Sequence, residues 1–146
     1  MKAYLTWGVG FGKGKILAQT NAQLDASLDK IKIKKLEKLE IPKCEIIKNK
    51  KELAKLRGDF SGIVLQNCAK GEVAASLVLG LAEDKIIIGH GKAGSLAKAE
   101  RIAEYEVKKA INEQSSGLDY HIASVAPSKK GEYGCAIVAL VLVDGK

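Results

Sequence analysis

The sequence has few of the residues on which specialised binding sites most often depend. Of its 146 residues only 5% are aromatic, two are histidine, and two, Arg57 and Arg101, are arginine. Nucleic-acid bases stack on aromatic side chains and phosphates fit the fork of arginine, so a shaped nucleic-acid site is not expected. The excess of lysine, which gives a net charge of +7, indicates mainly a solvated basic surface.

Cysteine and long apolar runs are also scarce. Cys44, Cys68 and Cys135 are an odd number in scattered contexts without a Cys-x-x-Cys pair, which argues against a disulfide framework and a zinc site. We therefore expect no metal site and a reducing, cytoplasmic environment. No apolar run is long enough to span a bilayer and no signal peptide is recognisable, so we predict no association with a membrane.

The apolar stretch that stands out is residues 134–143, where Cys135 is the only residue with a polar group in its side chain. A strand at the surface would alternate polar and apolar residues. This stretch does not alternate, and it predicts a strand covered on both faces. With 47% hydrophobic residues the chain can bury a core, and residues 1–146 are expected to form a single domain.

The rest of the chain predicts two similar halves. In the first, a strand at residues 3–7 runs into glycines at 8, 10, 12 and 14 and then a helix at 16–29. In the second, a strand at 86–88 runs into residues 89–94 and a helix from Ser95 to about Asn112. Further strands are predicted at 31–33, 44–47, 60–66, 73–81 and 120–126. We predict an α+β fold with four layers, αββα, made of a duplicated βαββ-like unit.

Both glycine-rich stretches are predicted to be turns that lead into a helix. In the run from Gly8 to Lys15 neither lysine is followed by the Ser or Thr that a phosphate loop requires. A structural turn is the main interpretation, and an anion site is the alternative.

Three residues of the second stretch and one residue of the first helix are candidates for ligand binding. His90 and Lys92, next to Gly89, would suit a carboxylate or phosphate at a helix N-terminus, although the same loop can simply turn the chain. Asp25 either faces solvent or meets an interface or a cationic ligand.

Several segments together resemble the pyruvoyl-dependent arginine decarboxylases. The resemblance is carried by EYGCAIVALVLV at residues 132–143, by LDASL at 24–28 and by IIIGHGKAGSLAKAER at 86–101. It implies the same four-layer αββα sandwich, assembly as a homotrimer or higher oligomer, and a place in polyamine metabolism.

The chemistry of that family depends on a Ser-Ser pair shortly before Ile-x-Pro. The chain cleaves between the serines, and the second becomes the pyruvoyl group that accepts electrons as CO2 leaves. When the motif is anchored on Pro42, Lys38 and Leu39 occupy these positions, and the family's glutamate falls on Gly89. Asp25 falls on the aspartate that lies near the substrate guanidinium. The resemblance therefore implies no catalytic residue and no pyruvoyl cofactor.

Three hypotheses remain open at this point. The first is a pseudoenzyme that binds a small cationic amine or amino acid, or assembles with a catalytic paralogue. The second is an active arginine decarboxylase whose processing site lies elsewhere, for example at Cys44, although that residue follows Pro42. The third is weak binding of a polyanion, with nucleic acid as the less expected partner, by the lysines of residues 30–38 and 48–51 and of the glycine-rich stretches.

Overall fold

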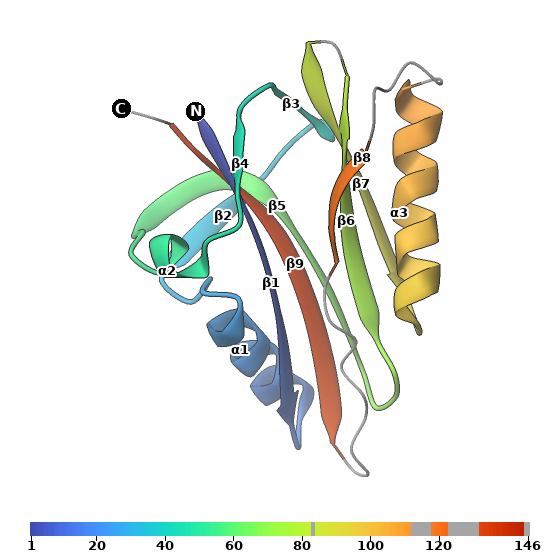
Figure 1. The fold of residues 1–146 in the computed structure, drawn as a ribbon. Helices are drawn as coiled ribbons and strands as arrows, with labels where there is room; N and C mark the ends of the chain where they lie inside the picture. The colour runs from blue at the N-terminus through green and yellow to red at the C-terminus, as the bar shows by residue number, and fades with distance from the viewer. Residues whose placement is uncertain (83, 112–117, 123–131, 145–146) are drawn as a thin grey trace.

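The computed structural model describes residues 1–82, 84–111, 118–122 and 132–144. Their strands form two sheets (Figure 1). Sheet A has the strand order β2-β5-β9-β1-β4, and sheet B has the order β3-β7-β6-β8. The elements are β1 (Lys2–Gly12), α1 (Lys15–Asp25), β2 (Ile31–Lys35), β3 (Glu40–Pro42), β4 (Glu45–Ile47), α2 (Lys50–Leu53), β5 (Gly58–Ala69), β6 (Ala74–Leu81), β7 (Lys85–Ala93), α3 (Leu96–Ile111), β8 (Leu118–Ile122) and β9 (Tyr133–Val143).

Strand β9 lies inside sheet A, antiparallel to β1 on one side and to β5 on the other. Its residues are buried from position 134 to position 141. Ala136, Val138 and Leu140 contribute to one buried cluster, and the alternate residues Ile137 and Ala139 contribute to another. The prediction of a strand covered on both faces is confirmed.

Three clusters of buried side chains join the elements. The largest combines Leu5 and Leu140 of sheet A with Leu77 and Ile88 of sheet B, so the two sheets pack against each other. A second cluster lies between sheet A and α1, and a third, around Val107, lies between sheet B and α3. Figure 1 accordingly shows α1 and α3 on opposite sides of the strands.

The first glycine-rich stretch is not a turn, so this prediction is wrong. Strand β1 continues to Gly12, and α1 begins at Lys15. A Cβ on Gly8 would come within 2.6 Å of the Ala22 carbonyl oxygen and 2.7 Å of the Ala26 nitrogen. Glycine at alternate positions therefore lets the backbone of α1 lie directly on the strand. The two residues left between β1 and α1 are too few for a phosphate-binding loop.

The second glycine-rich stretch is also strand, because β7 runs to Ala93. A Cβ on Gly89 would collide with the Ala103 carbonyl oxygen and come within 2.7 Å of Val107 Cγ2. Since side chains alternate along a strand, His90 and Lys92 lie on the opposite face of β7. The prediction that these residues form a loop at a helix N-terminus is therefore wrong.

The cysteine prediction is wrong as well. Cys68 of β5 and Cys135 of β9 lie directly opposite each other in the antiparallel ladder and form a disulfide, while Cys44 is free. Strand register brings together two residues that are 67 positions apart in sequence. The cysteines therefore no longer support the expectation of a reducing compartment.

The two long helices are confirmed. α3 begins after Ser95, whose Oγ accepts a hydrogen bond from the Lys98 nitrogen at 3.3 Å, as expected of an N-cap. The strand predicted at 120–126 corresponds to β8 as far as Ile122, and its remainder lies outside the described residues, as does the turn predicted for 127–132 except Glu132. None of the described helices combines the length and apolarity needed to cross a membrane.

Candidate functional site

Asp25, a predicted ligand-binding residue, is exposed at the end of α1. Its Oδ2 accepts a hydrogen bond from the Val9 backbone nitrogen at 2.9 Å. Strand β4 pairs with β1 only from Lys2 to Tyr4, so Val9 lies on an open edge of sheet A. Asp25 satisfies a backbone donor that lacks a strand partner, which gives it a structural role without any ligand.

Glu106 repeats this arrangement in the second half of the chain. Its Oε1 accepts a hydrogen bond from the His90 backbone nitrogen at 2.8 Å, and His90 Nδ1 lies 3.7 Å from the same oxygen. Val9 and His90 are 81 residues apart, as are Asp25 and Glu106. The same contact between a helix carboxylate and a strand edge therefore occurs twice at equal spacing.

Lys38 and Leu39, which the resemblance in sequence aligns with the family's serines, directly precede β3 at the edge of sheet B. The Ile88 nitrogen donates a hydrogen bond to the Leu39 carbonyl oxygen at 2.8 Å, so Leu39 extends the pairing of β3 with β7. Gly89 is the next residue of β7. Lys38 and Leu39 thus lie near Gly89. Asp25 lies on α1, which packs on the other sheet, and Lys92 is exposed further along β7.

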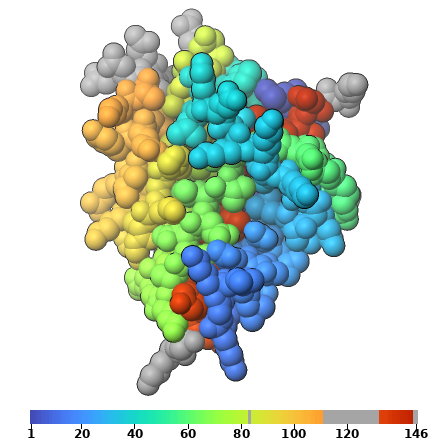
Figure 2. Space-filling model, turned by 180° about the vertical axis from the view of Figure 1, so that it is seen from behind, coloured from blue at the N-terminus to red at the C-terminus, as the bar shows by residue number. Residues whose placement is uncertain are grey.

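An open groove of about 1100 Å³ separates the region of β3 from α3. In Figure 2 these are the cyan segment and the neighbouring yellow and orange helix. Leu39, Ile87, Ile102 and Tyr105 supply apolar lining, and the last two are 44% and 67% exposed. The groove arises because α3 packs on the glycines of β7, which leaves the strip of sheet B next to β3 uncovered by that helix.

Five charged side chains border the groove, and the two acids already have partners. Glu40 pairs with Lys85 at 3.1 Å, and Glu106 accepts the bond from the His90 nitrogen. The cations of the groove, for which the described residues supply no acidic partner, are Lys38, Arg101 and Lys109. Among the described residues, three cations without an acidic partner thus accompany one carboxylate without a Lys or Arg partner, that of Glu106, so the unpaired charge of the groove is mainly positive.

The side chains that line the groove do not fit a pyruvoyl group. Such a group forms from serine or, in some enzymes, from cysteine, and Lys38 and Leu39 can supply neither. Among the described lining residues Tyr105 carries the single hydroxyl, and none carries a thiol. The groove can bind and orient a small molecule, but its residues offer no electron sink for decarboxylation.

Cys44 does not compensate for the missing serines. Its side chain is partly buried against the cluster between the sheets. Burial raises the pKa of the Cys44 thiol, although the N-terminal ammonium opposes this effect. A thiol that keeps its proton is a weak nucleophile, and Cys44 follows β3 instead of preceding it.

The groove residues of α3 were not anticipated from the sequence. Apolar periodicity predicts Ile102 on the apolar side of the helix and predicts no role for Arg101, Tyr105 and Lys109. A signal was nevertheless present in the sequence: the spacing of 81 that relates Gly8 to Gly89 also relates Asp25 to Glu106.

Comparison with known proteins gives no independent assignment. No family model matches the chain, and no curated protein matches it significantly. The resemblance to the pyruvoyl-dependent arginine decarboxylases consequently rests on the sequence segments given above.

Proposed function

We propose that the chain is a divergent member of the pyruvoyl-dependent arginine decarboxylase family that neither cleaves itself nor decarboxylates arginine. The observation that carries the proposal is the presence of Lys38 and Leu39 beside β7, where the family has its two serines. Without a carbonyl electron sink the carbanion left by CO2 cannot be delocalised. At Gly89, the position of the family's glutamate, a side chain would collide with α3.

The proposal includes the family's four-layer αββα sandwich made of a duplicated βαββ-like unit. The two units would be β1-α1-β5-β6 and β7-α3-β8-β9. Strand β9 lies between β1 and β5 in sheet A, and β6 lies between β7 and β8 in sheet B. The last strand of each unit would therefore belong to the sheet that contains the first strand of the other unit. The spacing of 81 residues relates Gly8 to Gly89 and Ala22 to Ala103, which make the same strand–helix contact.

The ligand we propose for the groove is a small amine or amino acid, and the alternative role is that of a partner subunit for a catalytic paralogue. Lys38, Leu39 and the edge of β7 near His90 would contribute to this site. Asp25 lies on the other sheet, so it could join the same ligand only across an interface between copies of the chain.

Arginine turnover tests the proposal against an active decarboxylase. Purified protein incubated with arginine should yield no agmatine. Formation of agmatine that borohydride abolishes would demonstrate a carbonyl cofactor and contradict the proposal, because borohydride reduces the carbonyl or its imine.

We propose a homotrimer or higher oligomer, as in the family. Helix α1 supports this proposal because Ile16, Leu17 and Leu24 are 79%, 52% and 53% exposed. Exposed apolar side chains of this kind are often covered by another subunit. Sedimentation equilibrium should give an oligomer that Leu24→Gln weakens, whereas a monomeric wild-type protein would contradict the proposal.

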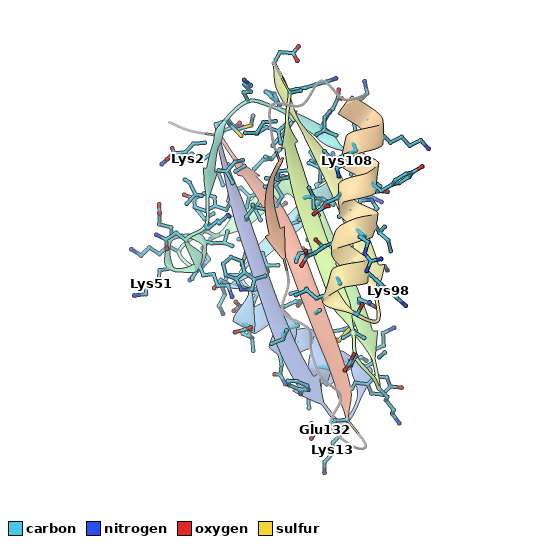
Figure 3. The ribbon with its side chains drawn as sticks, turned by 45° about the vertical axis from the view of Figure 1, so that its right-hand side comes forward. Lys2, Lys13, Lys51, Lys98, Lys108 and Glu132 are labelled. Carbon is cyan, nitrogen blue, oxygen red and sulfur yellow. A yellow bond between two sulfur atoms is a disulfide. The ribbon has the colours of Figure 1, made fainter. Side chains whose placement is uncertain are left out.

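A second candidate function is weak polyanion binding, which the distribution of charge favours. Residues 30–57 contain eleven of the 24 Lys and Arg residues and four of the 17 acids, so this segment alone carries a net charge of +7. This segment lies between α1 and β5 and contains β2, β3, β4 and α2. The corresponding connection in the second half, from α3 to β8, is only six residues long. Figure 3 shows Lys51 of this segment on the side of the molecule away from α3.

Binding to a nucleic acid tests this second candidate. Affinity for an RNA or DNA duplex should fall steeply as salt is raised, because each lysine–phosphate contact releases counterions. The absence of any complex at low salt would remove the candidate.

A cytoplasmic location also stays part of the proposal. The disulfide between Cys68 and Cys135 makes this point testable, since disulfides rarely persist in a reducing compartment. Alkylation of both cysteines in intact cells would support the cytoplasm, and their protection would oppose it.

A further inference from the structure

The groove between β3 and α3 combines an apolar lining with unpaired positive charge. We infer that it takes a small molecule with an apolar body and a carboxylate, and that the carboxylate, not an amine, is the group the groove requires. This inference depends on the proposed function only for the placement of a small ligand in the groove.

The apolar part of the argument rests on α3. Ile102 and Tyr105 are 44% and 67% exposed, and both line the groove together with Leu39 and Ile87. Ligand sites are commonly concave and mainly apolar, with a few polar groups that fix the orientation. The volume of about 1100 Å³ accommodates an aromatic or branched aliphatic body with room to spare.

The charged part of the argument rests on which groups are already occupied. A ligand ammonium would have to share Glu40 with Lys85, or bind Glu106 beside the His90 backbone N–H, while the three cations of the groove repel it. A carboxylate displaces neither contact. Arg101 and Lys109, which line the groove without an acidic partner among the described residues, can receive it directly.

The arrangement of α3 allows one ligand to reach both kinds of group. Arg101, Tyr105 and Lys109 are spaced four residues apart, so they form one row along the helix. An aromatic ring lying against Tyr105 therefore has a cation one turn away in either direction. Arg101 is the better carboxylate partner because its guanidinium binds both oxygens at once.

Three probes with the same aromatic body test the inference: phenylpropionate carries only the carboxylate, phenylethylamine only the amine, and phenylalanine both. Titrations followed by NMR shifts should move the signals of Ile102 and Tyr105 with phenylpropionate and phenylalanine but not with phenylethylamine. Binding of phenylethylamine as tight as that of phenylpropionate would overturn the inference while leaving the proposed function intact. No binding of any probe would contradict the inference and the placement of a small ligand in the groove.

Variants on α3 distinguish a specific carboxylate site from nonspecific attraction to the positive charge of the helix. Arg101→Gln and Lys109→Gln should each weaken phenylpropionate binding by about three- to five-fold, as expected for an exposed ion pair. Lys98→Gln and Lys108→Gln are the matched controls, because both lysines lie on α3 without lining the groove (Figure 3). Equal weakening by the control variants would contradict a specific carboxylate site.

A second copy of the chain is the competing occupant of the same surface. Tyr105→Ser should weaken phenylpropionate binding and leave the sedimentation coefficient unchanged. If this variant instead dissociates an oligomer, the groove is an interface between copies and the inference is wrong.

Discussion

At the scale of single residues, the fold depends on glycines that let a helix backbone lie directly against a strand, in the space that a side chain would otherwise fill. Gly8 faces the backbone of α1, and Gly89 faces the backbone of α3, at equivalent places in the two halves. Helix backbone atoms cannot move aside as a flexible side chain can. These positions are therefore structural, and their resemblance to a phosphate loop is accidental.

Gly8→Ala and Gly89→Ala should each lower the free energy of unfolding by about 3 kcal/mol, because the added methyl group has no space. Gly71→Ala, where no atom lies within 4 Å of the added Cβ, is the control and should change stability little. Urea unfolding of the three variants measures the effect. Equal stability of Gly8→Ala and Gly71→Ala would show that α1 does not lie on β1 as described.

Tyr4 gives a second residue-level prediction. Its partly buried hydroxyl donates a hydrogen bond to Glu52 Oε1 at 3.3 Å. Burial raises the pKa of Tyr4 above 10.0, and the Glu52 carboxylate adds to this effect. The unfolded chain then loses the phenolic proton at a lower pH than the folded protein, so stability should fall as the pH rises above 10.

Tyr4→Phe should remove part of this fall, since phenylalanine cannot ionise. Urea unfolding of the wild type and Tyr4→Phe near neutral pH and above pH 10 supplies the comparison. Identical alkaline slopes for the two proteins would show that Tyr4 does not titrate differently on unfolding.

At the scale of elements, each sheet has a strand that runs past its short neighbour, and a helix carboxylate covers the exposed edge. Asp25 of α1 serves β1 at Val9, and Glu106 of α3 serves β7 at His90. Open strand edges invite pairing with other chains, and capping their N–H groups reduces that risk.

Asp25→Ala should leave the Val9 N–H without a protein partner and cost about 1 kcal/mol. Hydrogen exchange at Val9 should become faster, with little change at the centre of β9. Asp29→Ala is a suitable control, because that carboxylate pairs with the neighbouring Lys30 at 3.9 Å. Unchanged exchange at Val9 in Asp25→Ala would contradict the edge contact.

The elements could be predicted from the sequence wherever side chains report their surroundings. The run of apolar residues in β9 predicts burial on both faces, and apolar periodicity with the Ser95 cap predicts α3. Glycines carry no such information, so β1 and β7 were predicted to end too early. The alanines at 18, 22 and 26 were the available clue, because a row of small residues allows a helix to approach a strand closely.

The groove could not be predicted, because it depends on how α3 is rotated on sheet B. Periodicity places Ile102 on the apolar side of the helix, yet contact of Ala99 and Ala103 with the glycines leaves Ile102 44% exposed. Strand register, which sequence patterns do not give, decides the pairing of Cys68 with Cys135.

At the scale of the whole molecule, the two sheets pack against each other, and each contains strands from both halves of the chain. One disulfide joins β5 to β9 within sheet A. The excess charge is confined to residues 30–57, which leaves the rest of the chain neutral. The repeated framework of glycines and alanines thus lies outside the segment that would contain the processing site.

Thiol counting tests the covalent structure of the whole chain. Protein purified without reductant and then unfolded should react at one cysteine, Cys44, and at all three after reduction. Mass mapping of the alkylated peptides identifies the positions. Reaction at Cys68 and Cys135 before reduction would show that the pair stays reduced.

The central claim, that this chain does not process itself, is tested most directly by its intact mass under denaturing conditions. The account predicts one unbroken chain of 15.6 kDa, even after prolonged incubation of the folded protein. Two fragments with a pyruvoyl group at the new N-terminus, which cleavage before a serine or before Cys44 could produce, would contradict it.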